Sequence, residues 1–352
     1  MILFVIYSLE QGGAERVIAH LANYWAAKGR QVGILTFDTS LPQYALHPAV
    51  QLNQMGIAYP SNNKLAGLVN NFKRVLILRG YIKNLRPSTV ISFTEEINSL
   101  VCLATIGRRF RLVLSDRVHP DWFGKRPIRQ WFKRVSYRLA DVLVVQTQAV
   151  KSAYKGYKLP IFVINNPLNS VSQRVIDYEK KRIVAVGRLD PQKNFPLFIE
   201  AVSRLHAPDW TFDIFGAGNE KAALQRLITE KDLDNRLILR GSTSRIFDDM
   251  SEASIFVLSS LAEGYPNVLI EAMSVGLAVV STDCPSGPSE IIYNNINGLL
   301  IENNNVLEMT AALQRLIDDA PLRRQIGEQA QNIIEKLNID VIAQAWEQHL
   351  GH

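Results

Sequence analysis

Two acidic residues, Glu263 and Glu271, lie eight positions apart where the sequence changes from a loop to a helix. Pro266 or Asn267 opens this predicted helix, which places Glu271 about one turn inside it. A loop carboxylate can accept hydrogen bonds from sugar hydroxyls, and a helical one can hold a ribose diol, as acids do in nucleotide sites. Glu271 could instead be an exposed helical acid, but its apolar neighbours predict a buried helix, where an unpaired acid is costly.

Two cations, Arg188 and Lys193, follow a predicted strand at 183–186 and precede a helix. Arginine binds a diphosphate through two parallel hydrogen bonds, and a nearby lysine adds a point charge. A lone loop cation is usually solvated. Two cations at the end of one strand indicate an anion site more strongly than one does.

Paired glycines occupy two further strand-to-helix turns, Gly12 with Gly13 and Gly216 with Gly218. Glycine lets a ligand approach the backbone, and the following helix offers free N–H groups to an anion. An ordinary tight turn explains either pair at least as well. The Gly-x-Gly-x-x-Gly fingerprint of dinucleotide sites is absent.

The elements that must hold these loops alternate between short apolar strands and amphipathic helices. Strands are predicted at 2–6, 32–37, 89–93, 112–114, 142–146, 162–164, 183–186, 211–215, 236–239, 255–258, 278–281 and 298–301. Helices are predicted at 14–27, 68–85, 128–140, 195–205, 219–231, 267–275, 306–318, 321–337 and 340–349. Such alternation gives parallel sheets covered by helices on both faces. These strands are too many for one open sheet. We therefore predict two doubly wound α/β domains, 1–170 and 171–337, and a C-terminal helix in 338–352 that packs across their junction.

Ligands of doubly wound sheets bind at the carboxyl ends of the strands, where all four of these loops lie. The order of the loops resembles that of the retaining glycosyltransferases of the GT-B fold, family 4 (glycosyl transferases group 1). The resemblance rests first on Glu263 and Glu271, with seven residues between them. It extends to residues 12–15, 187–194, 216–218, 281–292 and 297–300. Within the family the chain resembles bacterial transferases that add N-acetylgalactosamine or hexose to lipid-linked oligosaccharides.

The resemblance implies two Rossmann-like domains that face each other across a cleft. It implies a nucleotide-diphosphate sugar, expected to be a UDP-sugar, on the C-terminal domain. Arg188 and Lys193 would stabilise the departing diphosphate and Glu263 would hold the donor sugar, so these three are the expected catalytic residues. The residues assigned to donor binding are Gly12, Gly13, Gly216, Gly218, Gly264, Tyr265, Pro266, Asn267 and Glu271. The anomeric configuration would be retained. No metal or cofactor would be needed, because the two cations and helix N-termini neutralise the diphosphate.

The loop after the predicted strand 112–114 departs from the family pattern. Many relatives carry a histidine here near the reacting carbon, whereas this chain has Arg117 at the position that we align with it and His119 two residues later. We predict an acceptor-side role for both side chains. A loop imidazole in ordinary hydrogen bonds explains His119 equally well.

Charge is divided unevenly along the chain. Residues 1–170 carry 22 Lys and Arg against 8 Asp and Glu, a net +14, whereas the remainder is −8 and the total is +6. A basic half of this size attracts anionic lipid, nucleic acid or a phosphorylated substrate. Six of its cations lie in 64–86 and ten in 107–138.

The basic stretches are interleaved with apolar and aromatic residues, among them Trp122, Phe123, Trp131 and Phe132. This composition is typical of helices at a lipid headgroup surface. The alternative is that the apolar residues form the domain core and the cations are solvated. The cations that we assign to the acceptor side are Lys73, Arg74, Arg79 and Lys83.

Composition excludes several other classes. A content of 47% hydrophobic residues excludes a disordered chain, and two cysteines exclude a disulfide framework or a zinc site of paired thiolates. No apolar run reaches the roughly 18 residues of a membrane span, and the N-terminus lacks the pattern of a signal peptide. We expect a cytoplasmic protein, peripherally associated with the inner face of the cytoplasmic membrane.

The function that these features favour is transfer of a hexose or N-acetylhexosamine to a polyprenyl-diphosphate-linked saccharide in surface polysaccharide or glycan synthesis. The expected partners are the nucleotide sugar, the lipid-linked acceptor and an anionic membrane surface, with no nucleic acid. A GT-B sugar-nucleotide epimerase or a soluble sugar-phosphate glycosyltransferase is the enzymatic alternative. A nucleotide-sugar-binding or nucleic-acid-binding module is the non-enzymatic one.

Overall fold

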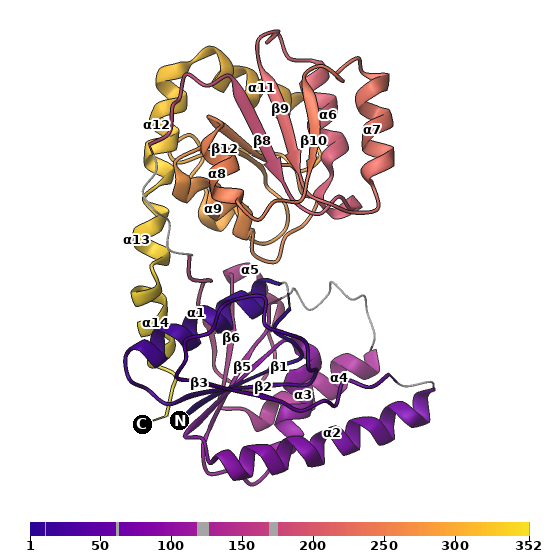
Figure 1. Cartoon of the computed structure of the whole chain (residues 1–352), viewed down its shortest axis with the longest axis vertical. Helices are drawn as coiled ribbons and strands as arrows, with labels where there is room; N and C mark the ends of the chain where they lie inside the picture. The colour runs from indigo at the N-terminus through magenta and orange to yellow at the C-terminus, as the bar shows by residue number, and fades with distance from the viewer. Residues whose placement is uncertain (11, 61–62, 118–126, 169–174, 352) are drawn as a thin grey trace. The chain divides into compact units, whose positions relative to one another are not determined.

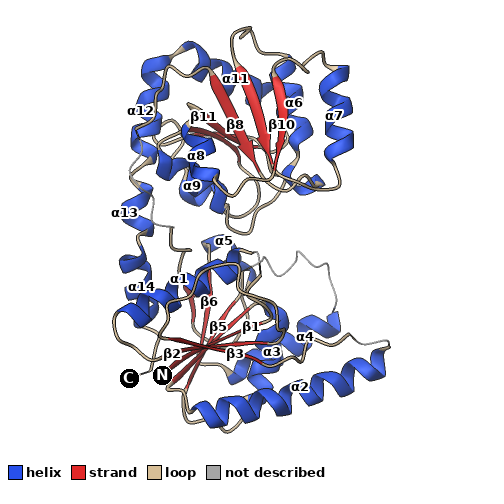
Figure 2. Cartoon of the chain, in the orientation of Figure 1, coloured by secondary structure: helices blue, strands red, loops and turns tan. Residues whose placement is uncertain are grey.

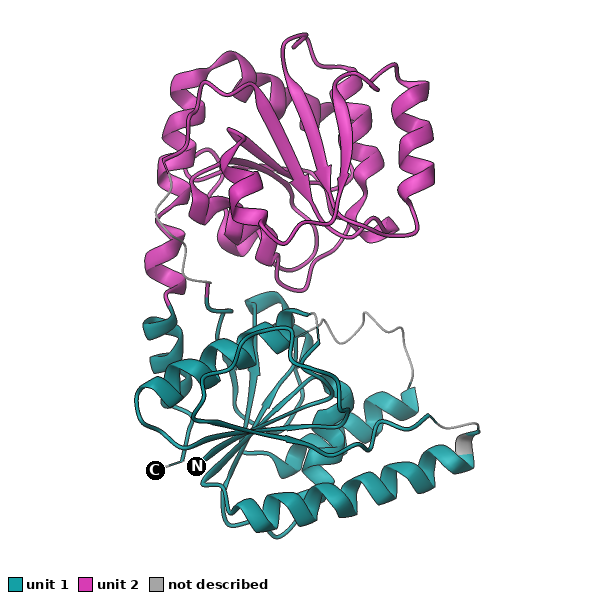
Figure 3. Ribbon diagram, in the orientation of Figure 1, with its two compact units in different colours: residues 1–167, 339–352 teal, residues 168–338 magenta. Residues whose placement is uncertain are grey.

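The chain forms two compact units in a computed structural model that describes residues 1–10, 12–60, 63–117, 127–168 and 175–351 (Figures 1 and 3). Unit 1 comprises Met1–Pro167 and Ile339–His352, and unit 2 comprises Leu168–Asn338. The chain thus returns to unit 1 after completing unit 2. The last helix is part of unit 1, and its predicted packing across the junction of the two domains stays a prediction.

Unit 1 is built on a parallel sheet of seven strands in the order β3-β2-β1-β4-β5-β6-β7 (Figure 2). Its strands are β1 (Ile2–Ile6), β2 (Val32–Thr36), β3 (Val50–Gln54), β4 (Thr89–Phe93), β5 (Arg111–Ser115), β6 (Val142–Val145) and β7 (Ile161–Val163). Its helices are α1 (Gly13–Ala27), α2 (Lys64–Leu85), α3 (Glu95–Ala104), α4 (Pro127–Ser136), the 3₁₀ turn η1 (Tyr137–Leu139), α5 (Gln148–Ala153) and α14 (Ile339–Glu347). The central strands are apolar throughout because helices cover both faces of the sheet.

Unit 2 has a parallel sheet of six strands in the order β10-β9-β8-β11-β12-β13. Its strands are β8 (Arg182–Val186), β9 (Thr211–Phe215), β10 (Leu237–Gly241), β11 (Ile255–Leu258), β12 (Ala278–Thr282) and β13 (Leu299–Ile301). Its helices are η2 (Pro191–Lys193), α6 (Phe195–Ser203), α7 (Lys221–Glu230), α8 (Ile246–Ser251), α9 (Asn267–Val275), α10 (Pro288–Ile291), α11 (Val306–Asp318), α12 (Ala320–Ala330) and α13 (Ile333–Leu337). Both units are therefore doubly wound α/β domains, as the alternation in the sequence predicts.

Each sheet has one position at which the strand order reverses. In unit 1 the first strand, β1, lies between β2 and β4, and in unit 2 the first strand, β8, lies between β9 and β11. The connections that leave the two strands on either side of this position run to opposite faces of the sheet. A crevice therefore opens at their carboxyl ends, which is where ligands of open α/β sheets bind.

Some predicted elements differ from those in the structure. The sequence analysis misses β3, whose side chains are half exposed at the edge of the sheet, and it misses α3, α5, α8 and α10. The predicted helix 321–337 is two helices, α12 and α13. The strand predicted to be buried at 162–164 is the edge strand β7, where Phe162 is exposed. No helix in the described ranges has both the length and the apolar content needed to span a bilayer.

Candidate functional site

The loops that follow β8 and β11 are joined to each other at the reversal point of unit 2. The backbone N–H of Leu261 donates to Gln192 O (2.8 Å), and Gln192 Nε2 donates to Ala262 O (2.8 Å). Ser259 Oγ donates to Lys193 O (2.7 Å). These bonds fix the two loops as one rigid surface at the carboxyl edge of the sheet.

This surface carries an ion pair between two of the predicted catalytic residues. Lys193 Nζ lies 2.6 Å from Glu263 Oε1, and both side chains are largely buried. Ser260 Oγ donates to the same carboxylate oxygen (2.6 Å), and Ser286 Oγ donates to Glu263 O (2.6 Å). The carboxylate is therefore held by a cation and a hydroxyl, and the cation is within reach of any anion that enters the crevice.

Arg188, the third predicted catalytic residue, points into solvent. Its side chain is 75% exposed, and its guanidinium pairs with Asp190 Oδ2 at 2.9 Å. Asp190 also accepts a hydrogen bond from the backbone N–H of Lys193 (3.2 Å), which caps the turn η2. The structure thus joins Lys193 to Glu263 and pairs Arg188 with Asp190 instead.

The glycines at 216 and 218 have a packing role in the structure. A Cβ at Gly216, whose φ is +152°, would lie 1.8 Å from Gly187 O, and one at Gly218 would lie 2.2 Å from Leu189 O. Only glycine allows the loops after β8 and β9 to approach this closely. The predicted role of both glycines in donor binding stays a prediction.

Helix α9 carries the second predicted acid, Glu271. Tyr265 and Pro266 are buried where the helix begins, and Glu271 is buried one turn further on, as the apolar neighbours in the sequence predict. Gly287, with φ +123°, lets the next loop pack on this helix start, since a Cβ there would lie 2.7 Å from Pro266 Cδ. Gly264 and Asn267 lie on the same turn, half-buried.

The only thiol near this surface among the described residues is Cys284, which is inert. Burial, reinforced by the negative charge of Glu263, raises the pKa of Cys284 to about 12. The thiol is therefore protonated at physiological pH and is no nucleophile.

In unit 1, the turn at Gly12 and Gly13 leads into α1, as predicted. The Glu15 carboxylate folds back toward Gly12, so that a Cβ on Gly12 would lie 2.1 Å from Glu15 Oε2. Burial raises the pKa of Glu15, and hydrogen bonds from the backbone N–H groups of Glu15 and Ala14 partly offset this rise. An acidic side chain thus occupies the anion-attracting start of this helix.

Arg117 is packed within unit 1. Its guanidinium lies 4.5 Å from the ring centre of Phe93 and 5.7 Å from that of Trp346, and it donates to Asn166 Oδ1 (2.7 Å). These contacts connect the end of β5 to helix α14. Its acceptor-side role stays a prediction, and His119 lies outside the described residues.

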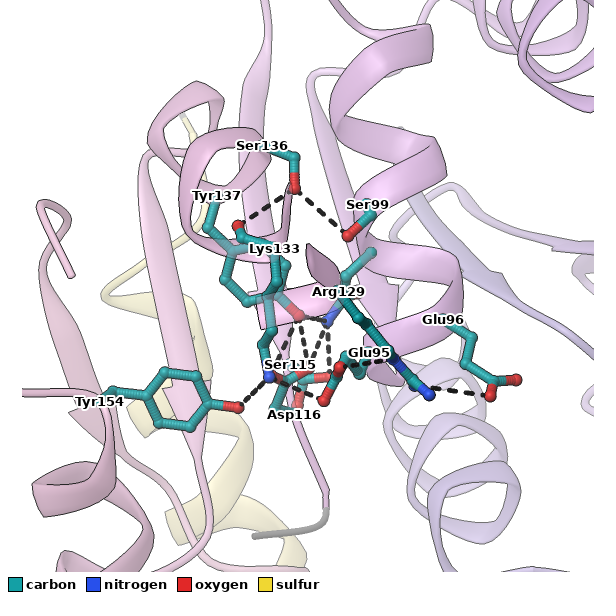
Figure 4. Close-up of polar contacts among 11 residues, drawn as sticks. Glu95, Glu96, Ser99, Ser115, Asp116, Arg129, Lys133, Ser136, Tyr137 and Tyr154 are labelled. Carbon is teal, nitrogen blue, oxygen red and sulfur yellow. Dashed lines mark hydrogen bonds and ion pairs between the residues drawn. The ribbon is translucent and has the colours of Figure 1, made fainter. Parts of the chain in front are cut away.

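The sequence analysis overlooked a buried ionic network in unit 1 (Figure 4). Asp116, which directly follows β5, accepts hydrogen bonds from Asn98 Nδ2 (2.7 Å), Tyr137 (2.9 Å) and Tyr154. Lys133 Nζ from α4 lies 2.9 Å from Asp116 Oδ2, and it also contacts Glu95 and Tyr154.

The charges of this network are matched. Burial lowers the pKa of Lys133, but the charges of Asp116 and Glu95 outweigh it, so that its pKa lies above the usual value. Burial and the charge of Asp116 raise the pKa values of Tyr137 and Tyr154 well above normal, so both hydroxyls remain donors. A signal was present in the sequence, because two acids, Glu95 and Glu96, follow the end of the predicted strand 89–93 after a single residue.

Two of the predicted acceptor-side cations on α2 are used within unit 1. Arg74 donates to Ile57 O (3.0 Å) and Tyr59 O (2.7 Å). Arg79 donates to the carbonyl oxygens of Ala104 (3.2 Å), the last residue of α3, and of Ile106 (2.9 Å). Lys73 and Lys83 are exposed.

Two family models match successive parts of the chain. Residues 11–170 match the model described as Glycosyltransferase Family 4, and residues 169–333 match the model described as Glycosyl transferases group 1. The chain is therefore a glycosyltransferase. It belongs to the group 1 glycosyltransferases of family 4, as the resemblance in its sequence implies.

Similar proteins cover nearly the whole chain. An uncharacterized glycosyltransferase of Haemophilus influenzae is 27% identical over 98% of both chains. An alpha-1,4-N-acetyl-D-galactosaminyltransferase of Campylobacter jejuni, named for a saccharide on undecaprenyl diphosphate, is 26% identical over 98% of this chain and 96% of its own. The structure of Anabaena HepE in complex with UDP matches with a TM-score of 0.81 at 19% identity over 99% of this chain and 98% of that one. This likeness shows the fold, which is GT-B.

Proposed function

We propose that this glycosyltransferase moves a hexose or N-acetylhexosamine from a nucleotide-diphosphate sugar, most simply a UDP-sugar, to a saccharide on a polyprenyl diphosphate. The observation that carries the proposal is the buried Lys193–Glu263 pair at the reversal point of the unit 2 sheet. A cation and a carboxylate held side by side match a ligand that is a diphosphate at one end and a polyol at the other. The structure of the similar protein Anabaena HepE in complex with UDP supports uracil as the base of the nucleotide sugar.

The chemistry that we propose retains the anomeric configuration. The bond between the anomeric carbon and the diphosphate oxygen breaks as the bond to the acceptor oxygen forms on the same face of the sugar. The proton of the acceptor hydroxyl passes to the departing phosphate oxygen. Lys193 stabilises the negative charge that develops on the diphosphate, and Glu263 holds the sugar hydroxyls in place.

The transfer that we propose needs no metal ion, because Lys193 and the start of helix α9 supply positive charge to the diphosphate. Arg188 is exposed on the same loop, and its ion pair with Asp190 is open to solvent. An exposed pair of this kind contributes little stability. The guanidinium can therefore exchange Asp190 for a phosphate at little cost.

A lipid-linked acceptor is supported by the surface of α2. The side chains of Leu65, Leu68, Val69, Phe72 and Leu76 are all more than half exposed. Their spacing of three and four residues places them on one side of the helix, whereas Leu78 and Ile82 carry its contact with the core. The alternative in which the apolar residues of this stretch form the core of the domain is therefore wrong for these five side chains, whereas it holds for Ile82.

Helix α4 adds a second exposed apolar surface. Ile128, Trp131, Phe132 and Val135 are exposed on it, while Lys133 points inward. The exposed cations Lys73 and Lys83 accompany the apolar side chains of α2. Apolar side chains with cations beside them bind the headgroup region of an anionic membrane, and we propose that unit 1 does so at the inner face of the cytoplasmic membrane.

The proposal is tested by incubating the protein with a panel of UDP-, GDP- and nucleoside-diphosphate-sugars, with and without an undecaprenyl-diphosphate-linked saccharide, in EDTA. We expect one donor to be consumed, release of its diphosphate to depend on the acceptor, and an alpha-linked product from an alpha-configured donor. Conversion of a donor to its epimer without acceptor would favour the epimerase. Transfer only to free sugar phosphates would contradict the lipid-linked acceptor, and loss of turnover in EDTA would contradict metal independence.

A further inference from the structure

A cavity of about 400 Å³ opens in unit 1 beside the amino ends of its central strands. It lies among the last turns of α2, which precede β4, the end of α3, and the loop 105–110, which precedes β5. Ligands of open α/β sheets bind at the other edge, at the carboxyl ends of the strands. The strands β4 and β5 have five residues each, so about 17 Å of sheet lies between the two edges. The cavity is therefore separate from the crevice at the reversal point.

Two basic stretches that are distant in the sequence meet in this cavity. Arg79 and Lys83 come from α2, one turn apart, and Arg108 and Arg109 come from the loop before β5. None of the described residues that line the cavity is acidic. A concave site lined by cations without acids attracts an anion.

The positive charge of three of these cations is not compensated by a neighbouring acid. Arg108 pairs with Asp141 Oδ2 at 2.7 Å. Arg79 bonds only to carbonyl oxygens among the described residues, and these carry no net charge. Lys83 and Arg109 are exposed and form no ion pair within the described part of the chain. An anion in the cavity would therefore meet three cations that are not paired with a carboxylate.

Hydrogen bonds hold the wall of the cavity in place. Arg79 Nη1 lies 3.2 Å from Ala104 O and 2.9 Å from Ile106 O, which joins α2 to the end of α3. Arg108 Nε donates to Phe110 O (3.1 Å), which fixes the loop before β5. A guanidinium has five N–H donors. Because the bonds of Arg79 use Nη1, its Nε and Nη2 groups are left for a ligand.

Exposed apolar side chains adjoin the cations. Phe72, Leu76, Arg79 and Lys83 follow one another at spacings of four, three and four residues, which places them on one side of α2. Ile106, which is 50% exposed, lines the cavity itself. Cations next to exposed apolar side chains match a ligand that joins an anionic group to an apolar chain.

We propose that this cavity binds a phosphate group, with Arg79 and Arg109 donating to its oxygen atoms and Lys83 adding positive charge beside them. Arginine binds phosphate through two parallel hydrogen bonds, and lysine acts as a point charge. The headgroup of an anionic phospholipid and a small phosphorylated compound in solution both present this group. The apolar side chains beside the cavity favour the phospholipid.

The volume of the cavity lies within the roughly 300–1,000 Å³ of small-molecule sites. The inference goes beyond the proposed function, because the ligand is neither the sugar donor nor the acceptor and its binding requires no transfer.

The test measures binding to the full chain by isothermal titration calorimetry. The probes are two short-chain lipids below their micelle concentration, dihexanoylphosphatidylglycerol and dihexanoylphosphatidylcholine, and glycerol phosphate as the soluble compound. We expect one dihexanoylphosphatidylglycerol to bind per chain, at least tenfold more tightly than dihexanoylphosphatidylcholine. Weaker binding of glycerol phosphate identifies the lipid as the source of the phosphate, whereas equal or tighter binding identifies a soluble compound. Binding of neither anionic probe overturns the proposal.

A charge reversal assigns the binding to the cavity. Arg109→Glu changes a cation of its wall, and the matched control Lys155→Glu makes the same change at an exposed lysine of unit 1 that does not line it. We expect the Kd of the tighter anionic probe to rise at least tenfold in Arg109→Glu and to stay within twofold in Lys155→Glu. Circular dichroism should show both variants folded. Equal Kd values for the two variants overturn the proposal.

The lipid-linked acceptor that we propose also carries phosphate groups, so transfer assays in detergent without phospholipid separate it from the ligand of this cavity. The KM for the acceptor should stay within twofold in Arg109→Glu. A rise of at least tenfold would show that the cavity holds the acceptor diphosphate, and would overturn a separate site. If the wild-type protein transfers no sugar, the proposed function fails, whereas the calorimetry still decides this inference.

Discussion

The ion pair between Lys193 and Glu263 holds both charged side chains in fixed positions before any ligand binds. The pair is largely buried, so removing either partner leaves a charge that has lost its compensation. Glu263 keeps a second donor in Ser260, 2.6 Å away. In the function that we propose, the carboxylate would therefore keep a hydrogen bond from Ser260 when Lys193 binds the donor diphosphate.

Replacing Lys193 with methionine should lower kcat/KM for the donor at least 100-fold. The departing diphosphate would lose its nearest buried cation, and removing one such electrostatic contact typically costs 10²–10³ in rate. Steady-state transfer assays measure the effect.

The matched control is Lys221→Met, at an exposed lysine at the start of α7. Its kcat/KM should stay within twofold of the wild type, and circular dichroism should show both variants folded. Near-normal transfer by a folded Lys193→Met variant would contradict the assignment of Lys193 to the donor site.

Helix α9 shows how far local sequence determines an element. Its observed ends are the predicted ones, Asn267 and Val275, because Pro266 precedes it and Gly276 follows in the left-handed conformation. Strand β3 has no such signals. Its alternating residues 50–54 are typical of a half-exposed edge strand, and the element is recognisable only once β2 is beside it.

The Lys193–Glu263 pair and the buried network around Asp116 differ in the same way, in how far the sequence alone predicts them. The contact of Lys193 with Glu263 follows from one rule, since both residues lie in segments that follow the carboxyl ends of two neighbouring strands, β8 and β11, of a doubly wound sheet. The network around Asp116, which directly follows β5, includes side chains from α3, α4 and η1 and from Tyr154 at the end of α5. No single motif therefore contains it. Lys133 belongs to a basic stretch that we interpreted as a lipid-facing or solvated surface, and only packing shows that this one cation is buried.

Because this network joins five segments, breaking it should destabilise unit 1. Lys133→Met should lower the free energy of unfolding by about 3–5 kcal/mol, the usual effect of removing one partner of a buried ion pair. Arg138→Met, five residues on and exposed, should change it by less than about 0.5 kcal/mol. Urea unfolding followed by circular dichroism measures both, and equal values would contradict the buried pair.

The same network gives the stability a dependence on alkaline pH. The pKa of Lys133 is raised above 10.5, so its stabilisation is present below that pH and is lost as the pH rises through the folded value. Tyr137 and Tyr154 act in the same direction, because in the unfolded chain they ionise near pH 10.0 and in the folded chain they do not. Tyr154→Phe should therefore make the decline above pH 10 shallower than in the wild type, and an unchanged slope would contradict this origin.

The first half of the sequence is basic and the second half is acidic. Some cations of the basic half are bonded to other groups of the protein, and others are exposed. Arg74, Arg79, Arg129 and Lys133 bond to protein oxygen atoms. These contacts leave the net +14 of residues 1–170 unchanged, because that sum already includes the acids and carbonyl oxygens carry no net charge. A net charge of this size attracts an anionic partner, and the exposed apolar stripe of α2 supports our proposal that this partner is a membrane.

Phe72→Ser should weaken binding of the protein to vesicles of phosphatidylcholine with 30% phosphatidylglycerol by about tenfold or more. Burying a phenylalanine side chain contributes about 1.5–3 kcal/mol, and Phe72 is 65% exposed on the stripe. Lys73→Gln with Lys83→Gln should weaken binding further at low salt, by about 1 kcal/mol for each charge removed. Leu41→Ser is the matched control, because Leu41 is 86% exposed in unit 1 but lies off α2. Sedimentation with vesicles measures all three, and equal binding of Phe72→Ser and Leu41→Ser would show that α2 does not face the lipid.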